Sequence, residues 1–144
     1  MQSDGDKKLR IVLDDGAFAP TRAHTYDAGL DIYAAEDRVL WPNSRDIVET
    51  GVHVEIPRGY VGFLTSKSGL MRDYGVTTRG TIDSGYTGTI KVIVFNGGTD
   101  PLYISKGQKL SQLVIVPIIT PEIEVVDKLQ DTDRGSHGFG STGR

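Results

Sequence analysis

The chain has 144 residues, no cysteine and a formal net charge of −3. This length fits one domain with one modest core, and the lack of cysteine excludes disulfides and thiolate zinc sites. The acidic balance argues against binding along DNA or RNA, whereas a small anionic ligand is compatible with it. The longest apolar run, residues 113–119, contains a proline and is far shorter than the roughly 20 residues of a membrane helix. The N-terminus is polar, so we expect a cytoplasmic protein (host cytoplasm if the source is viral) with no nucleic-acid or membrane partner.

Alternation of apolar and polar residues predicts β-strands with one buried face along most of the chain. The alternating sets are Leu9, Ile11 and Leu13; Leu30, Ile32 and Ala34; Val52, Val54 and Ile56; Ile90, Val92 and Val94; and Ile123 and Val125. Turn signals at residues 14–16, 42–44, 57–59, 96–98 and 105–107 separate these runs. One short helix is predicted at residues 68–74. Many short strands with regular turns predict an all-β sandwich or barrel.

The last stretch differs from the rest, because the alternation stops after Val126 and the following residues are polar and Gly-rich. We predict one β-barrel domain at residues 1–130 and a C-terminal arm at residues 131–144. Termini of this kind are usually frayed tails. This one also carries a guanidinium, small hydroxyls, unhindered backbone N–H groups and one aromatic ring, which suit a triphosphate and a base.

A second Gly-rich segment, residues 80–88, is predicted to form a hairpin bend. Asp83 could be an ordinary turn former there, because Asp-Ser-Gly is common in turns. The sharper interpretation gives the bend a chemical role. Its backbone would read the edge of a base, the Tyr86 ring would lie under the sugar and exclude a ribose 2′-hydroxyl, and the ionised Asp83 carboxylate would take a proton from water.

Three further segments are weaker on their own. Asp31 lies on the opposite strand face from Leu30 and Ile32, which also describes a solvated aspartate. Residues 66–70 combine a cation, a hydroxyl and a bend, as many plain loops do. Gln112 enters a buried strand, where it could merely satisfy a backbone group.

Together and in this order, five segments resemble the five motifs of the trimeric deoxyuridine triphosphatases. They are Ala-Gly-Leu-Asp at 28–31, Ser-Lys-Ser-Gly-Leu at 66–70, Gly-Thr-Ile-Asp-Ser-Gly-Tyr-Thr-Gly at 80–88, Gly-Gln-Lys-Leu-Ser-Gln at 107–112 and Arg-Gly-Ser-His-Gly-Phe-Gly-Ser-Thr-Gly at 134–143. The third and fifth are specific, and the others support them. The resemblance implies a jelly-roll-like β barrel with a flexible Gly-rich C-terminal arm. It also implies a homotrimer whose active sites are shared between subunits, with the arm reaching over a neighbour.

The activity that this resemblance implies is hydrolysis of dUTP to dUMP and pyrophosphate with Mg²⁺, which limits uracil in DNA and supplies dUMP for thymidylate synthesis. Asp83 would activate the water that attacks the α-phosphorus, and Asp31 would contact the magnesium shell through water. The backbone from Gly80 to Ile82 would read the uracil edge. The residues implied to bind substrate are Lys67, Ser68, Gly80, Ile82, Tyr86, Gln112, Arg134, Phe139, Gly140, Ser141 and Thr142.

Four positions depart from the commonest family pattern. Lys67 and Lys109 stand where arginine is more frequent, Gly85 where an acidic residue is, and His137 where glycine is. We interpret His137 as a passive residue of the arm, with phosphate binding by its protonated ring as the alternative.

Three other functions compete with this interpretation. A dCTP deaminase of similar architecture would release ammonia and would not need the arm in this form. A nucleotide-gated protein would sense dUTP and act on a regulatory protein partner, which a catalytic chain could also do as a second role. A purely structural jelly roll would leave the arm motif unexplained.

Overall fold

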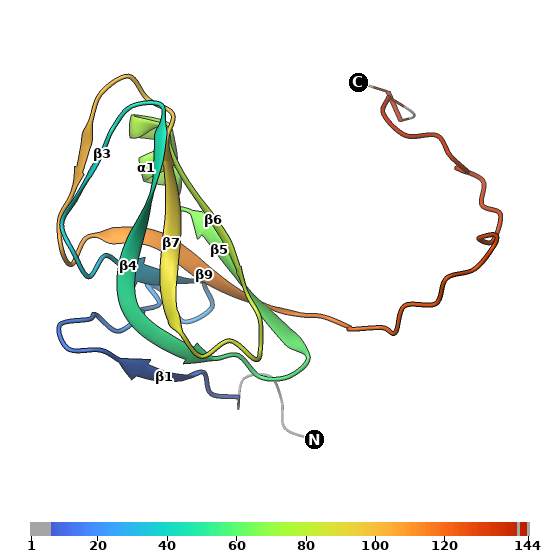
Figure 1. The fold of residues 1–144 in the computed structure, drawn as a ribbon, viewed down its shortest axis with the longest axis horizontal. Helices are drawn as coiled ribbons and strands as arrows, with labels where there is room; N and C mark the ends of the chain where they lie inside the picture. Colours follow the sequence, from blue (N-terminus) through green and yellow to red (C-terminus); the bar gives the residue numbers. More distant parts are fainter. Residues whose placement is uncertain (1–6, 141, 144) are drawn as a thin grey trace.

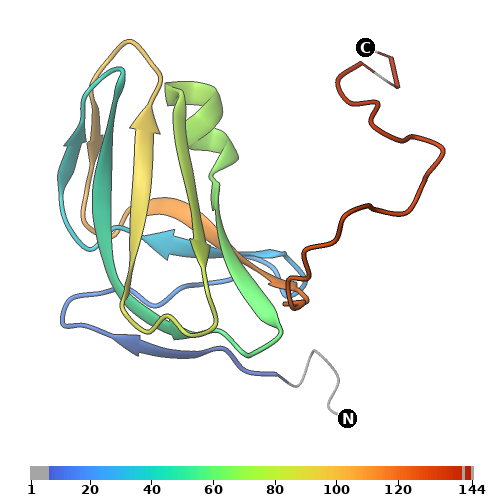
Figure 2. The same ribbon diagram turned by 45° about the vertical axis from the view of Figure 1, so that its right-hand side comes forward.

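The strands of the computed structural model, which describes residues 7–140 and 142–143, lie between the predicted turns. The elements are β1 (Arg10–Leu13), β2 (Gly29–Tyr33), β3 (Arg38–Leu40), β4 (Ser44–Glu55), β5 (Tyr60–Ser66), α1 (Ser68–Tyr74), β6 (Val76–Ile82), β7 (Thr89–Asn96), β8 (Leu102–Ile104) and β9 (Lys109–Pro117). Seven strands form one antiparallel sheet in the order β1-β4-β7-β6-β5-β9-β2, and β3 pairs with β8. The large sheet curls into a half-barrel (Figures 1 and 2). This confirms the predicted all-β, jelly-roll-like class.

The core lies on the concave side of this sheet and follows the predicted alternation. Its fully buried members are aliphatic, including Ile32 and Ala34 of the β2 segment, Val52, Val54 and Ile56 of the β4 segment, and Ile90, Val92 and Val94 of β7. Each buried isoleucine or valine contributes roughly 1.5–3 kcal/mol through removal from water. The only helix of the described residues, α1, occupies the predicted residues 68–74, and none of its residues is fully buried, although Leu70 packs against the core.

Two predicted buried faces are wrong. β1 forms where expected, but Ile11 and Leu13 are 37% and 41% exposed, because β1 is the outermost strand and pairs only with β4. Ile123 and Val125 form no strand and are each 94% exposed. The chain leaves the sheet after β9, so the backbone of residues 121–126 has no partner strand within the described chain.

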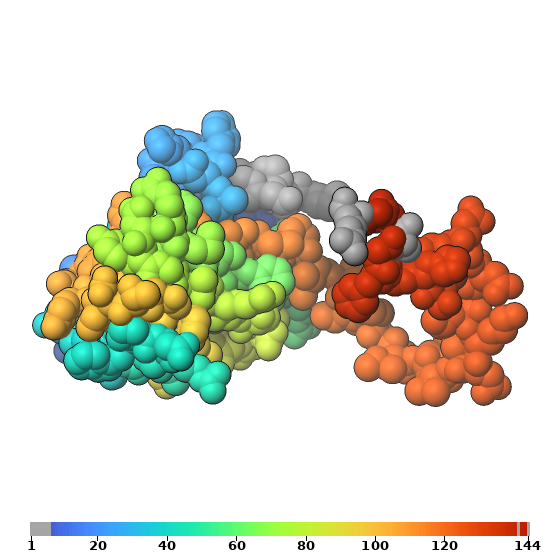
Figure 3. Space-filling model, turned by 90° about the horizontal axis from the view of Figure 1, so that it is seen from above, coloured from blue at the N-terminus to red at the C-terminus, as the bar shows by residue number. Residues whose placement is uncertain are grey.

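The C-terminal residues extend away from the barrel. The last backbone hydrogen bond to the body joins Ile118 N–H to the Gly59 carbonyl at 2.9 Å. Seen from above, the chain beyond it stands apart from the sheet (Figure 3). Within the described part of the chain, no helix is long and apolar enough to cross a membrane.

Candidate active site

Strand pairing brings Asp31, Lys67 and Gln112 together from three segments of the sequence. Asp31 of β2 lies opposite Gln112 of β9, and Gln112 lies opposite Thr65 of β5, two residues before Lys67. The Lys67 ammonium donates to Asp31 Oδ1 at 2.6 Å. Lys109 Nζ lies 3.4 Å from Asp31 Oδ2. We call these four residues the Asp31 cluster.

Electrostatically, the Asp31 cluster is a buried carboxylate held by two cations. Asp31 is only 6% exposed. Burial raises the pKa of its carboxyl group, but the hydrogen bonds and positive charges of Lys67 and Lys109 outweigh that effect, so the pKa lies below its ordinary value. Two ammonium groups against one carboxylate leave a formal charge of +1. The cluster can therefore attract an anion, and Lys67 and Lys109 are its available donors.

Gly29 explains why Gln112 can lie over β2. A Cβ atom at Gly29 would meet Gln112 Oε1 at 2.3 Å, so any larger residue would displace this amide. With glycine at residue 29, the amide keeps its position, and Gln112 Nε2 donates to the Ser66 carbonyl at 3.1 Å. The Gln112 amide is thereby fixed beside the residue that precedes Lys67. Gly29 of the first motif thus leaves the space that the Gln112 amide of the fourth motif occupies.

A network of hydroxyl groups fixes the backbone that leads into Lys67. The backbone pairing of β5 with β6 covers Gly62 to Leu64 only. Beyond it, the Ser66 hydroxyl accepts from Thr78 N–H at 2.9 Å and donates to the Thr78 carbonyl at 3.1 Å. Thr78 Oγ1 in turn lies 2.7 Å from the buried Ser111 Oγ. These hydroxyl groups replace the backbone hydrogen bonds that are missing beyond Leu64, and they hold the segment that carries Lys67 and Ser68.

The second group of predicted residues lies in the β6–β7 hairpin (residues 80–89), at the opposite end of β6 from α1 (Figures 1 and 2). A turn joins Tyr86 N–H to the Asp83 carbonyl at 3.0 Å. The Tyr86 hydroxyl donates to the Thr89 carbonyl at 2.8 Å, which folds the ring back on its own hairpin. Gly80, Ile82, Asp83 and Tyr86 line one cleft together with two cations, Arg79 and Lys91. The structure thus gathers four of the predicted substrate and catalytic residues in one hollow.

Gly88 is required for this position of Tyr86. A Cβ atom at residue 88 would lie 2.6 Å from the Tyr86 oxygen and 2.8 Å from Cζ, which real contacts essentially never show. For the dUTP hydrolysis that the family resemblance implies, we expect Gly88→Ala to push the ring away and to lower kcat/KM by about 10-fold or more. The matched control is Gly85→Ala in the same hairpin, where the added Cβ meets nothing within 4 Å. Equal steady-state kinetics of the two variants with dUTP and UTP would contradict the role of the ring.

The Asp31 cluster and the β6–β7 hairpin are separate within one chain. Asp31 is level with Thr65 along the sheet, whereas Asp83 follows Ile82, which pairs with Gly62. At about 3.3 Å per residue, the two carboxylates are offset by about 13 Å along the strands. Among the described residues, no hydrogen bond or ion pair joins the two groups.

The predicted residues of the C-terminal arm touch neither group. Arg134 Nε donates to the His137 carbonyl at 2.8 Å, a contact within the arm itself. Phe139 is fully exposed, and Gly140 and Thr142 are also exposed. Ser141 lies outside the described residues. The arm of one chain therefore does not cover the candidate site of that chain.

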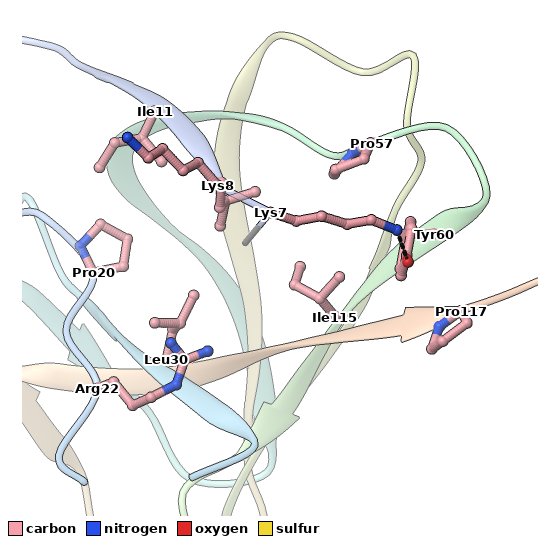
Figure 4. A pocket seen from close by; sticks show the side chains of 11 residues that line it. Lys7, Lys8, Ile11, Pro20, Arg22, Leu30, Pro57, Tyr60, Ile115 and Pro117 are labelled. Atoms are coloured by element: carbon pink, nitrogen blue, oxygen red, sulfur yellow. Dashed lines mark hydrogen bonds between the residues drawn. The ribbon is translucent and has the colours of Figure 1, made fainter. Parts of the chain in front are cut away.

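A separate groove opens between β1, β2, β5 and β9 (Figure 4). Apolar residues such as Leu30 and Ile115 form its floor, and basic residues stand at its rim, among them Lys7, which donates to the Tyr60 hydroxyl. None of the predicted site residues lines it. The groove is therefore distinct from both candidate groups.

Sequence reasoning left several of these supporting residues unassigned. In the sequence, Lys109 is only a departure from the commonest family pattern, yet its ammonium pairs with Asp31. Thr78 and Ser111 had no signal, because the hydroxyl contacts depend on where β5 and β6 separate. Gly88 was part of a motif, but its contact with Tyr86 needs coordinates. His53, which contacts the hairpin, lies outside all five motifs.

Comparison with known proteins connects this geometry to a family. A family model described as dUTPase matches residues 15–143, a range that contains all five segments. The chain belongs to the dUTPase family. It is therefore an enzyme of the deoxyuridine triphosphate nucleotidohydrolase class, and dUTP hydrolysis is its activity at the level of the family.

Relatives and solved structures of dUTPases match nearly the whole chain. The deoxyuridine 5′-triphosphate nucleotidohydrolase of Gloeothece citriformis is 41% identical over 140 residues, with 94% of this chain and 97% of that protein covered. The one from Clostridium tetani is 39% identical, with 95% and 96% covered. The dUTPase of Staphylococcus bacteriophage 80alpha with dUpNHpp has a TM-score of 0.90 at 35% identity, covering 95% of this chain and 99% of that chain. A variant dUTPase from phage phi11 of S. aureus, described with a structural Mg(II) ion, has a TM-score of 0.80 at 35% identity, covering 85% and 98%.

Proposed function

We propose that this dUTPase hydrolyses dUTP to dUMP and pyrophosphate through a water molecule activated by Asp83. The water oxygen attacks the α-phosphorus, the bond from that phosphorus to the bridging oxygen breaks, and pyrophosphate leaves. The proton of the attacking water passes to the Asp83 carboxylate. The product dUMP would supply thymidylate synthesis, and removal of dUTP would limit uracil in DNA.

The observation that carries this proposal is the shape of the β6–β7 hairpin. Asp83 and Tyr86 are three residues apart, and the turn between them is closed by a 3.0 Å hydrogen bond. The ring of Tyr86 is held against the hairpin backbone, where it would support a deoxyribose and leave no room for a 2′-hydroxyl. The backbone from Gly80 to Ile82 lines the same cleft and would read the uracil edge. Base recognition, sugar selection and the proton acceptor thus share one rigid element.

The Asp31 cluster fits the triphosphate and a hydrated magnesium ion. Among the described residues, no three His, Cys, Asp or Glu side chains gather to form a protein cage for a metal. Mg²⁺ bound to substrate phosphates usually keeps several waters and needs only one or two carboxylates, and Asp31 is the carboxylate available here. When bound, the ion would neutralise phosphate charge. Lys67, Ser68 and Gln112 would contact phosphate oxygens, Gln112 near the α-phosphate.

The separation of the three groups supports a homotrimer with shared active sites. The Asp31 cluster and the hairpin do not touch within one chain, and the arm reaches away from both (Figures 1 and 3). In the assembly, the arm of one subunit would close over a site of another. Arg134 would hold the terminal phosphate, Phe139 would cover the uracil, and Gly140, Ser141 and Thr142 would complete the lid.

The stacking role of Phe139 predicts a loss of affinity. Phe139→Ala is expected to weaken dUTP binding by about 1–3 kcal/mol, the usual value for base–aromatic stacking. Isothermal titration with a non-hydrolysable dUTP analogue measures it. Tyr26→Ala is the control, because Tyr26 is equally exposed but lies in the loop before β2. An affinity that Phe139→Ala leaves unchanged would refute the stacking role.

Product analysis tests the proposed reaction. Purified protein is incubated with dUTP, UTP, dTTP and dCTP, each with Mg²⁺ and then with EDTA. We expect dUMP and pyrophosphate from dUTP alone, with turnover lost on chelation. Ammonia from dCTP would reassign the chain to deamination. Binding of dUTP without turnover would favour the nucleotide sensor with a regulatory protein partner.

A further inference from the structure

One side chain from outside the five motifs grips the β6–β7 hairpin. His53 of β4 places Nδ1 2.7 Å from the carbonyl oxygen of Thr87. Its other ring nitrogen, Nε2, lies 2.9 Å from Asp14 Oδ1, in the turn that follows β1. The imidazole therefore bridges two segments that are 39 and 34 residues away from it in sequence, one of them the residue directly after Tyr86.

Both partners of His53 are hydrogen-bond acceptors. A carbonyl oxygen and a carboxylate oxygen can only accept, so each ring nitrogen must carry a proton for both contacts to form. A neutral imidazole has one N–H and can satisfy only one of the two. The geometry thus requires the imidazolium form. Its two fixed partners also hold the ring plane.

The backbone positions His53 for this contact. An irregularity in β4 separates the pairs Glu49–Lys91 and His53–Thr89. It is stabilised by Glu49 Oε1, which accepts from the N–H groups of Thr50 and Gly51 at 3.1 and 3.0 Å. The Gly51 carbonyl then accepts from Asp14 N–H at 2.8 Å, which brings Asp14 to the ring. His53 therefore lies at the end of a bulge whose backbone also binds Asp14, the carboxylate partner of the ring.

The charges around His53 favour the protonated form. The hydrogen bond to the Thr87 carbonyl and that to Asp14 raise the pKa of His53 above its ordinary value, against a smaller opposing effect of burial, and the charges of Asp14 and Glu49 add to the rise. Other charged groups on the adjoining strands are Glu55 with its partner Arg10, 3.4 Å away, and Lys91 opposite Glu49. The ring is 28% exposed, so it can exchange protons with solvent.

We infer that His53 is a positioning residue that, as the imidazolium, clamps Thr87 and so holds Tyr86 and Asp83 in the geometry for dUTP turnover. This inference rests on the proposed roles of Tyr86 and Asp83. It adds a pH-dependent support to the hairpin that lies outside the substrate site. Loss of the proton from the imidazolium breaks one of its two hydrogen bonds. If the bond to Thr87 breaks, the hairpin is released, and if the bond to Asp14 breaks, the ring is no longer held in its plane.

The pH dependence has a definite sign. Because the pKa of His53 is raised in the folded protein, its support is complete below about pH 6.5, the usual histidine value, and is lost as pH rises through the raised value. We expect kcat/KM for dUTP to fall on that alkaline side. Asp14→Asn removes the negative partner, so the alkaline fall should move to lower pH.

The experiment compares His53→Gln, Asp14→Asn and wild type, between about pH 6 and about pH 9, by two readouts. The first is the pH profile of kcat/KM, for which His53→Gln should lie about 10-fold below wild type at neutral pH and should lack the alkaline fall. The second is NMR of the unliganded protein, in which the amides of residues 84–88 should titrate together with the His53 ring. His24→Gln is the matched control, because His24 also contacts an aspartate, Asp27, at 2.9 Å, but not the hairpin.

The two readouts separate this inference from the proposed function. Absence of dUTP turnover in wild type would reject the proposed function, whereas the NMR titration would still show whether His53 clamps the hairpin. If the NMR signals of the hairpin amides do not change as the His53 ring titrates, the clamp is contradicted. An alkaline fall that His53→Gln and Asp14→Asn leave in place would contradict it as well.

Discussion

The Asp83→Asn variant is expected to lose between about 10²- and 10⁴-fold in kcat for dUTP, the usual contribution of a general base. Asparagine keeps the shape of aspartate and its turn-forming tendency, so the β6–β7 hairpin should persist. The amide cannot accept the proton of the attacking water, and turnover therefore falls while binding of a non-hydrolysable dUTP analogue is preserved. Rapid-quench kinetics and calorimetry measure the two quantities separately.

The control for Asp83→Asn is a second aspartate in an exposed turn. Asp100→Asn removes a charge of the same sign from the loop before β8, far from the predicted chemistry, and should leave kcat unchanged. A similar fall in both variants would indicate a general effect of net charge. Near-normal turnover by Asp83→Asn would remove Asp83 from its catalytic role.

Removal of the residues after Leu129 is expected to lower kcat/KM by about 100-fold or more while the barrel stays folded. The deleted residues carry Arg134 and Phe139, which would order over the triphosphate and the uracil only when substrate is bound. They contribute no side chain to the core, so the free energy of unfolding should change by less than about 0.5 kcal/mol. Steady-state kinetics and thermal unfolding measure the two effects.

A point variant directly before the deleted segment is the control for the truncation. Lys128→Ala breaks only an exposed 3.9 Å ion pair with Asp131 and should leave activity intact. The full truncation should also hydrolyse dUDP and dUTP at similar low rates, since a lid that grips the terminal phosphate would be missing. Near-normal dUTP turnover by the truncated chain would refute the lid.

Much of the fold could be predicted because alternating apolar residues and turn residues mark strands and turns within short stretches of sequence. Buried alternation located β2, β4 and β7, and glycines with positive φ, such as Gly59 and Gly107, mark turns that the sequence signals. The predicted burial of Ile11 and Leu13 and the predicted strand around Ile123 and Val125 were wrong for a shared reason. Period-two patterning reports that a face is apolar, not which surface covers it, and in the chain alone these faces are uncovered.

The candidate site was predictable only where it coincides with motifs. The residues of the hairpin and of the Asp31 cluster were named from the sequence, and strand register then placed Asp31, Gln112 and Lys67 together. Supports such as Thr78, Ser111 and His53 act across 12 to 39 residues of sequence through contacts with backbone and side-chain atoms. No residue pattern encodes such contacts, because they depend on bulges and on the point where paired strands diverge.

Subunit complementation tests the central claim, that the hairpin of one chain and the arm of another build a single active site. Asp83→Asn and the chain truncated after Leu129 are each expected to be nearly inactive. Refolded together in equal amounts, they would form mixed trimers in which about one quarter of the sites combine an intact hairpin with an intact arm from a different subunit. We predict about a quarter of the wild-type dUTP turnover for the mixture. Activity no greater than the mean of the two parents would show that hairpin and arm come from the same chain and would contradict the shared site.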